Sequence, residues 1–113
     1  MIAWRRLAGP ELHATLAATP GVALVMFGSA ACGACRAAHA RVPAWCAGQV
    51  DALFELDAGE AGGAVREFDV FHLPDFLVFR DGAFHARHSA PLNAQAWRAA
   101  LAATLAAPAQ EEP

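Results

Sequence analysis

Residues 22–35 of the chain read VALVMFGSAACGAC, an apolar run followed by two closely spaced cysteines. The run from Val22 to Phe27 contains no polar residue, which is typical of a central strand covered on both faces. From Gly33 onward the sequence becomes rich in alanine, the strongest helix former. The pattern therefore predicts a strand, a short loop and a helix, with Cys32 where the helix begins.

The two cysteines have the spacing and the position that thiol–disulfide exchange requires. A cysteine at a helix N-terminus faces unpaired backbone N–H groups and the positive end of the helix dipole, which favour the thiolate over the thiol. We therefore expect Cys32 to be the nucleophile that attacks a substrate disulfide. Cys35, one turn later, is expected to resolve the resulting mixed disulfide.

Metal binding is the alternative interpretation of this motif, because zinc sites use the same C-x-x-C spacing. His39 and Cys46 are the further candidate ligands. Unless Pro43 breaks the helix, Cys46 lies roughly 16 Å from Cys35 along it. That is too far for a disulfide, which needs Cα atoms within about 7 Å. We therefore expect no bound metal and interpret Cys46 as a small buried residue, with a regulatory or dimer-forming thiol as the alternative.

The rest of the chain alternates between apolar runs and helical periodicity. Pro43 inside the cysteine-bearing helix predicts a kink or a break. Residues 80–82, Arg-Asp-Gly, indicate a hairpin turn, and Asn93 indicates a helix N-cap. The expected elements are a helix from Gly9-Pro10-Glu11 to before Thr19, a strand over 22–27, a helix from Gly33 to about Gly48, strands over 52–57, 75–79 and 83–88, and helices over 61–68 and 94–106. This order predicts an α/β sandwich with a mixed sheet.

The composition limits the class of protein. The 113 residues are 57% hydrophobic and carry a net charge of −3, which fits one globular domain and excludes a disordered chain. Without a basic stripe we expect no nucleic-acid partner. The longest apolar run, residues 22–27, is too short to cross a bilayer, so we expect no membrane partner. We expect residues 1–107 to form the domain and 108–113 to be a flexible tail.

The N-terminus and the cysteine count bear on the compartment. The basic pair Arg5-Arg6 is not followed by the apolar stretch that a secretory or twin-arginine signal needs. The 3 cysteines make an odd number, which fits a reducing compartment better than a disulfide framework. Both observations predict a cytoplasmic protein.

Two motifs carry a resemblance to a known family. The first is residues 24–35, LVMFGSAACGAC, and the second is residues 70–82, VFHLPDFLVFRDG. In spacing both match the thioredoxin family, which the chain resembles over nearly its whole length. The resemblance implies an α/β fold, a thioredoxin-like three-layer sandwich with a central mixed sheet of four to five strands flanked by helices.

The second motif implies a substrate-binding loop. In the family, a proline at the position of Pro74 follows a cis peptide bond and sits against the dithiol. The residue before it, here Leu73, holds the substrate chain as an added strand through its backbone groups. A proline that enters an apolar strand without a preceding glycine is otherwise hard to explain.

The resemblance also implies an activity. The chain would be a thiol–disulfide oxidoreductase that exchanges disulfides with protein substrates through a redox-active disulfide of Cys32 and Cys35. Gly33 and Ala34 would be the active-site residues between them. We expect a monomer without a cofactor, and a thioredoxin reductase-like electron donor is the candidate redox partner. The alternative is a thioredoxin-fold binding or redox-sensing module with little turnover.

The surroundings of the dithiol depart from the family pattern. Thioredoxins usually carry a buried aspartate, the proton acceptor for the second cysteine, where this chain has Met26. They usually have tryptophans at the positions of Gly28 and Ala31 and a proline at the position of Ala34. Without a base near Cys35, resolution should slow wherever proton transfer limits it.

Other polar residues are candidates to replace the missing acid. His39, one turn past the second cysteine, and Asp57, at the end of its strand, are the two that we consider. His72 lies close to the expected cis-proline loop, where a contact with the dithiol and a surface role are both open. His85 and His88, on the hairpin, are expected to be exposed rather than to bind a metal.

Overall fold

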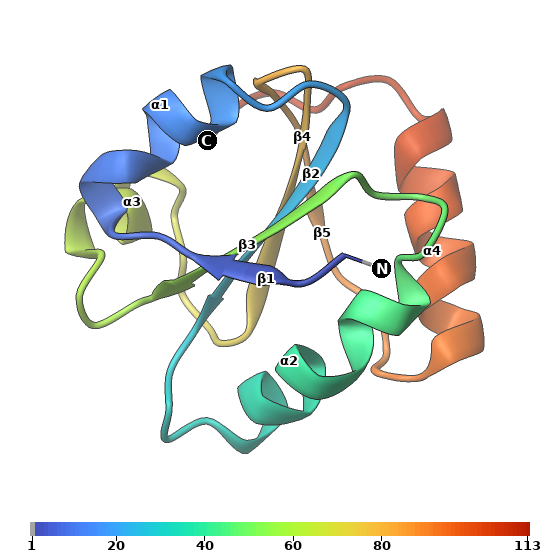
Figure 1. Cartoon of the computed structure of the whole chain (residues 1–113), viewed down its shortest axis with the longest axis horizontal. Coiled ribbons are helices and arrows are strands. Elements are labelled where there is room, and N and C mark those ends of the chain that lie inside the picture. The colour runs from blue at the N-terminus through green and yellow to red at the C-terminus, as the bar shows by residue number, and fades with distance from the viewer. Residues whose placement is uncertain (1) are drawn as a thin grey trace.

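The computed structural model describes residues 2–113 and contains a five-stranded mixed sheet with helices on both faces (Figure 1). In chain order the elements are β1 (Trp4–Arg6), the 3-10 helix η1 (Gly9–Glu11), α1 (Leu12–Ala17), β2 (Val22–Gly28), α2 (Gly33–Trp45), β3 (Ala52–Asp57), α3 (Gly62–Glu67), β4 (Asp75–Arg80), β5 (Ala83–His88) and α4 (Ala94–Ala106). The strand order is β1-β3-β2-β4-β5. The first three strands in this order are parallel, and β4 is antiparallel to both of its neighbours. The expected α/β sandwich with a mixed sheet is confirmed.

Strand β2 lies at the centre of the sheet. Residues 23–28 pair with β3 on one side, and residues 22–27 pair with β4 on the other. Every residue from Ala23 to Gly28 is buried. An unbroken apolar sequence suits this position because both faces of the strand are covered. The carboxyl end of β2 then positions the loop that leads to Cys32.

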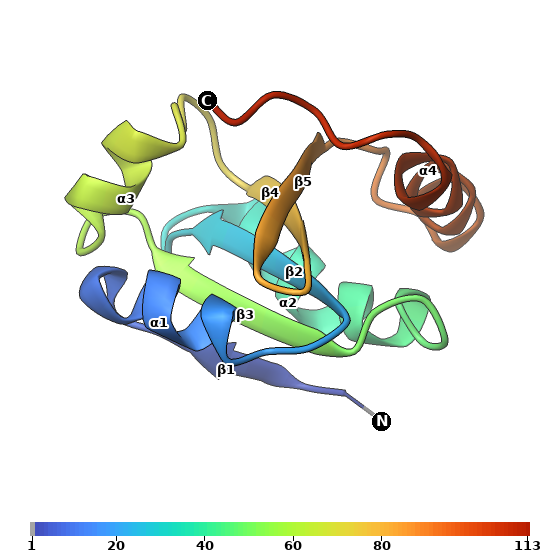
Figure 2. The same cartoon turned by 90° about the horizontal axis from the view of Figure 1, so that it is seen from above.

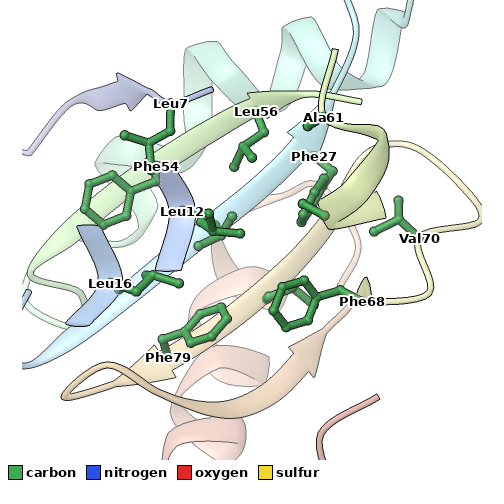
Figure 3. Packing of buried hydrophobic residues seen from close by; sticks show 14 residues of the cluster. Leu7, Leu12, Leu16, Phe27, Phe54, Leu56, Ala61, Phe68, Val70 and Phe79 are labelled. Atoms are coloured by element: carbon green, nitrogen blue, oxygen red, sulfur yellow. The ribbon is translucent and has the colours of Figure 1, made fainter. Parts of the chain in front are cut away.

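The helices cover the two faces of the sheet with separate apolar clusters (Figure 2). On one face, α1 and α3 pack against the sheet, with Leu12 and Phe68 near Phe27 in the cluster drawn in Figure 3. On the other face, α2 and α4 contribute residues such as Val42 and Trp97. The sheet therefore separates two cores, and the cysteine-bearing helix belongs to the second.

Two segments differ from the sequence expectation. The sequence predicts no strand near the N-terminus, yet Trp4–Arg6 form the edge strand β1 beside β3. A strand of this length is too short to show a period of two, so no pattern indicates it. The sequence also predicts a kink or a break at Pro43, but α2 continues through Pro43 to Trp45. The helix is therefore not split there.

The hairpin histidines are buried, which corrects the expectation that they are exposed. His85 is 5% exposed and His88 is 2% exposed, because α4 covers β5. The β4–β5 pairing shifts register beside His85, so this residue forms a β-bulge. Both rings then bond to Thr104 of α4: His85 Nε2 lies 2.9 Å from its carbonyl oxygen and His88 Nδ1 lies 3.1 Å from its hydroxyl oxygen.

The C-terminal segment follows α4 and has no regular structure. Residues 108–113 are exposed, but the Gln110 N–H donates to the His85 carbonyl at 2.7 Å. The Arg87 N–H donates to the Gln110 side chain at 3.0 Å. The flexibility of this segment stays a prediction. Among residues 2–113, none of the helices combines the length and the apolar character needed to cross a membrane.

Candidate active site at the Cys32–Cys35 disulfide

The cysteine pair lies at the start of α2, directly after the loop that leaves β2. Cys32 and Cys35 form a disulfide with their Cα atoms 5.2 Å apart. Cys32 is the N-cap of α2, and its Sγ accepts a hydrogen bond from the Cys35 backbone N–H at 3.1 Å. This N–H is one of the donors that a helix leaves unpaired in its first turn. It is placed to stabilise a Cys32 thiolate after reduction.

The two cysteines differ in exposure. Cys32 is half-buried, whereas Cys35 is 4% exposed. Gly33 and Ala34, between them, are exposed. Cys32 is therefore accessible from solution and Cys35 is not, which fits the order of attack expected from the sequence.

Gly28, the last residue of β2, lies directly against Cys35. A Cβ atom at this position would lie 3.3 Å from both the Cβ and the Sγ of Cys35. A larger residue on the same backbone would press on the buried sulfur. Glycine therefore lets the start of α2 pack closely on the end of the central strand.

The loop with Leu73 and Pro74 reaches the same edge of the sheet. The peptide bond between these two residues is cis. Strand β4 begins at Asp75, which pairs with Phe27, so Pro74 and Gly28 lie at corresponding ends of neighbouring strands. The fold thus brings this loop and the dithiol to one edge, and substrate binding by the loop stays a prediction.

A cavity of about 120 Å³ lies behind the disulfide, between the strands and α2. Its lining includes Cys35, Met26, His39 and Glu55. Met26 is buried and contributes no titratable group. Glu55 is the register partner of Met26 on β3, and its side chain is 14% exposed. A carboxylate therefore lies one strand away from the position where thioredoxins usually carry the aspartate.

His39 and Glu55 form a hydrogen-bonded pair at this cavity, with Nδ1 and Oε2 2.8 Å apart. The His39 ring stacks on Trp4 at 6.1 Å with 17° between the planes. The Trp4 indole N–H also donates to the His39 carbonyl at 2.9 Å. This carbonyl lacks its usual helical partner because Pro43 has no N–H. Arg6 Nε lies 3.8 Å from Glu55 Oε1, so several elements hold the pair in place.

Asp57, the other candidate base, does not line the cavity. Its Oδ1 accepts the backbone N–H groups of Gly59 and Glu60 at 2.8 and 3.3 Å. Asp57 therefore stabilises the turn after β3. The sequence patterns did not identify Glu55, although a charged residue within the otherwise apolar stretch of this strand is a signal for it.

The third cysteine lies apart from the disulfide. Cys46, the C-cap of α2, is a free, fully buried thiol, and its Sγ accepts the Trp97 indole N–H at 3.4 Å. Burial raises the pKa of the Cys46 thiol, outweighing the Trp97 hydrogen bond and the charge of Arg98, which lower it. The interpretation of Cys46 as a small buried residue is confirmed.

The remaining histidine near the loop, His72, is exposed. Within residues 2–113, no three or more histidine, cysteine, aspartate or glutamate side chains gather in a way that could hold a metal ion.

Comparison with known proteins gives structural relatives only. No family model matches the chain, and no curated protein matches it. Among solved structures, thioredoxin from Fasciola hepatica is 26% identical, and the match covers 75% of this chain and 85% of that chain with a TM-score of 0.66. A substituted thioredoxin from Halobacterium salinarum is 17% identical, and the match covers 99% of this chain and 94% of that chain with a TM-score of 0.72. The zinc-bound form of human ERp44 is 16% identical, and the match covers 88% of this chain and 30% of that chain with a TM-score of 0.70.

The fold, the disulfide and these relatives agree. The resemblance to thioredoxins noted in the sequence is confirmed in three dimensions. The chain has a thioredoxin-like fold, and its Cys32–Cys35 disulfide at the start of α2 supports a redox-type function.

Proposed function

We propose that the protein is a thiol–disulfide oxidoreductase that exchanges disulfides with protein substrates. The observation that carries this proposal is the disulfide itself: Cys32 caps α2 and accepts the Cys35 N–H, while Cys35 is buried behind it. Two-step exchange requires one thiolate that the substrate disulfide can reach and a second, buried thiol that it cannot reach.

The reaction then has two steps. The Cys32 thiolate attacks one sulfur of a substrate disulfide, forms a mixed disulfide and releases the other substrate thiolate. Cys35 loses its proton and attacks Cys32 Sγ, which forms the Cys32–Cys35 disulfide and releases the second substrate thiolate. The substrate gains two electrons and the protein loses two. An external dithiol, or a thioredoxin reductase-like electron donor, returns the protein to its reduced form.

The substrate chain is proposed to bind along the Leu73–Pro74 loop, next to Gly33 and Ala34. Support comes from the backbone of Leu73, which lies beyond the β2–β4 ladder where it ends at Asp75. This position supports the proposal that its polar groups pair with an extended peptide, as an added strand does.

The location and assembly of the protein are also part of the proposal. The odd number of cysteines and the buried free thiol of Cys46 fit a reducing compartment, so we propose that the protein is cytoplasmic. We also propose that it is a monomer.

Reduction of insulin disulfides by dithiothreitol tests the proposed activity. The protein should accelerate this reaction, Cys32→Ser should abolish the acceleration, and Cys46→Ala should preserve it. An inert parent protein would overturn the proposal. The Cys35→Ser variant should accumulate mixed disulfides, and mass spectrometry of the trapped complexes would identify the substrates.

A second candidate is a thioredoxin-fold binding or redox-sensing module with little turnover. The observation that favours it is Met26, an apolar side chain where an acid usually serves the second cysteine. This candidate predicts a partner complex that survives mutation of both active-site cysteines. It also predicts a reduction potential outside the range of roughly −120 to −270 mV found for dithiol oxidoreductases.

A further inference from the structure

The buried thiol of Cys35 must lose a proton before it can attack, because only the thiolate is a nucleophile. Cys35 is 4% exposed, and Met26 beside it carries no base. The sulfur itself therefore offers little surface to solvent, and the partly open cavity behind it is the route from this proton to an acceptor.

The cavity connects Cys35 to a pair of titratable side chains. Its volume of about 120 Å³ exceeds the roughly 10–15 Å³ that one water molecule needs. His39 from α2 and Glu55 from β3 both line it. The other charged groups that face it are Arg6 from β1 and Arg36 from α2, whose guanidinium donates to the Ala30 carbonyl at 2.7 Å.

The hydrogen bond between His39 and Glu55 determines which nitrogen of the ring is free. An ionised carboxylate only accepts hydrogen bonds, so Glu55 Oε2 takes the Nδ1–H of His39. In the neutral imidazole, Nε2 is then the unprotonated nitrogen and is available as a base. Trp4 stacks on the ring and bonds the His39 carbonyl, which keeps the ring at the cavity.

We propose that His39 is the proton acceptor for Cys35 and that Glu55 is the residue that positions and polarises it. This inference rests on the proposed exchange activity. In the mixed disulfide, the Cys35 proton passes through cavity water to His39 Nε2, and the thiolate attacks Cys32 Sγ. The bond between Cys32 and the substrate sulfur breaks as the Cys32–Cys35 bond forms. The departing substrate thiolate takes up a proton from solvent, and His39 returns its proton to solvent.

The test separates the two steps with an aromatic disulfide, 5,5′-dithiobis(2-nitrobenzoate), mixed with the reduced protein in a stopped-flow instrument. Attack by Cys32 releases one coloured thiolate, and resolution by Cys35 releases the second. In Glu55→Gln and in His39→Gln, the first release should keep its rate. The second should be slower by about 10-fold or more near neutral pH, because general-base assistance is lost. The difference from the parent should shrink as the solution becomes alkaline, because the thiol then ionises without a base.

A matched control is present in the chain itself. His13 and Glu67 form a second pair at the same distance, 2.8 Å, and neither residue lines the cavity behind Cys35. Glu67→Gln and His13→Gln should leave both releases unchanged. If the second release in Glu55→Gln and His39→Gln is as fast as in the parent, or is slower by the same factor at every pH, the proposed proton transfer to His39 is overturned. A missing first release would instead overturn the exchange activity itself.

Discussion

The two faces of the sheet are packed with different kinds of side chain. The cluster beneath α1 and α3 consists of aliphatic and aromatic side chains, several of which Figure 3 shows (Leu7, Leu12, Leu16, Phe27, Phe54, Phe68, Phe79). Beneath α2 and α4 lie a buried thiol, Cys46, and a buried imidazole, His88, both in contact with Trp97. All three cysteines belong to α2 or to its two caps.

The first face also has a buried carboxylate at one end, but a guanidinium group neutralises its charge. Asp75 is buried beside the loop that ends at Pro74, and Arg87 forms an ion pair with it. Arg87 also donates to the Phe68 carbonyl. The first face is therefore packed mainly with apolar side chains, while the helix on the second face carries the disulfide and the free thiol. Mutations on the two faces should therefore have different consequences.

The largest expected effect is on stability and comes from the first face. Phe68 is fully buried, edge-on to Phe79 at 5.9 Å and stacked with Phe84 at 6.3 Å. Phe68→Ala should lower the free energy of unfolding by about 3–5 kcal/mol, because it leaves a cavity among these rings. Urea denaturation measures the loss, and Phe68→Leu should cost less than Phe68→Ala because it leaves a smaller cavity. Slower disulfide exchange in the folded Phe68→Leu protein would contradict the separation of the two faces.

The next effect is a pH dependence that comes from the second face. Burial lowers the pKa of His88, so the folded protein keeps this imidazole neutral where the unfolded chain already binds a proton. Stability should therefore fall as the pH drops below about 6.5, by up to about 1.4 kcal/mol per pH unit. The loss should end near the lowered pKa of the folded state.

His88→Gln keeps a hydrogen-bonding side chain near Thr104 and removes this titration. Denaturation curves between about pH 5 and about pH 8 should then show a shallower slope for the variant than for the parent. Equal slopes would assign the acid sensitivity to other groups.

A smaller effect concerns the buried thiol of the second face. Because burial raises the pKa of Cys46, its thiol should stay protonated and react slowly with iodoacetamide in the folded, oxidised protein. Mass spectrometry should find rapid labelling only after unfolding. Cys46→Ala should cost about 1 kcal/mol and leave exchange unchanged. Rapid labelling of the folded protein would instead support a regulatory thiol.

Features that depend on adjacent residues could be predicted from the sequence. The apolar run before Cys32 indicated the central strand, and Asn93 accepts the Ala96 N–H at 2.9 Å as a helix cap should. The hairpin turn is present as well, with positive φ angles at Asp81 and Gly82. Each of these signals is local, since one turn or one strand contains all the residues involved.

Features that depend on packing between distant segments could not be predicted from the sequence. The burial of His88 requires α4 to lie over β5, and the bulge at His85 shows only in the pairing of two strands. Glu55 and His39 meet because β3 lies beside β2 and under α2, which no sequence spacing indicates. For the same reason the sequence does not show that the Asp57 carboxylate accepts backbone N–H groups in the turn after β3.

The smallest expected effect comes from the second histidine–glutamate pair, His13 of α1 and Glu67 of α3. The side chains of His13 and Glu67 are 63% and 42% exposed, whereas those of His39 and Glu55 are 54% and 14% exposed, so the two pairs differ mainly in the carboxylate. An ion pair that water screens to this degree contributes little, so Glu67→Gln should change the free energy of unfolding by less than about 0.5 kcal/mol. Thermal denaturation measures that change, and the insulin assay should not distinguish this variant from the parent. If Glu67→Gln slowed exchange as much as Glu55→Gln does, the effect of Glu55 would reflect the overall loss of a carboxylate charge and not its place behind Cys35.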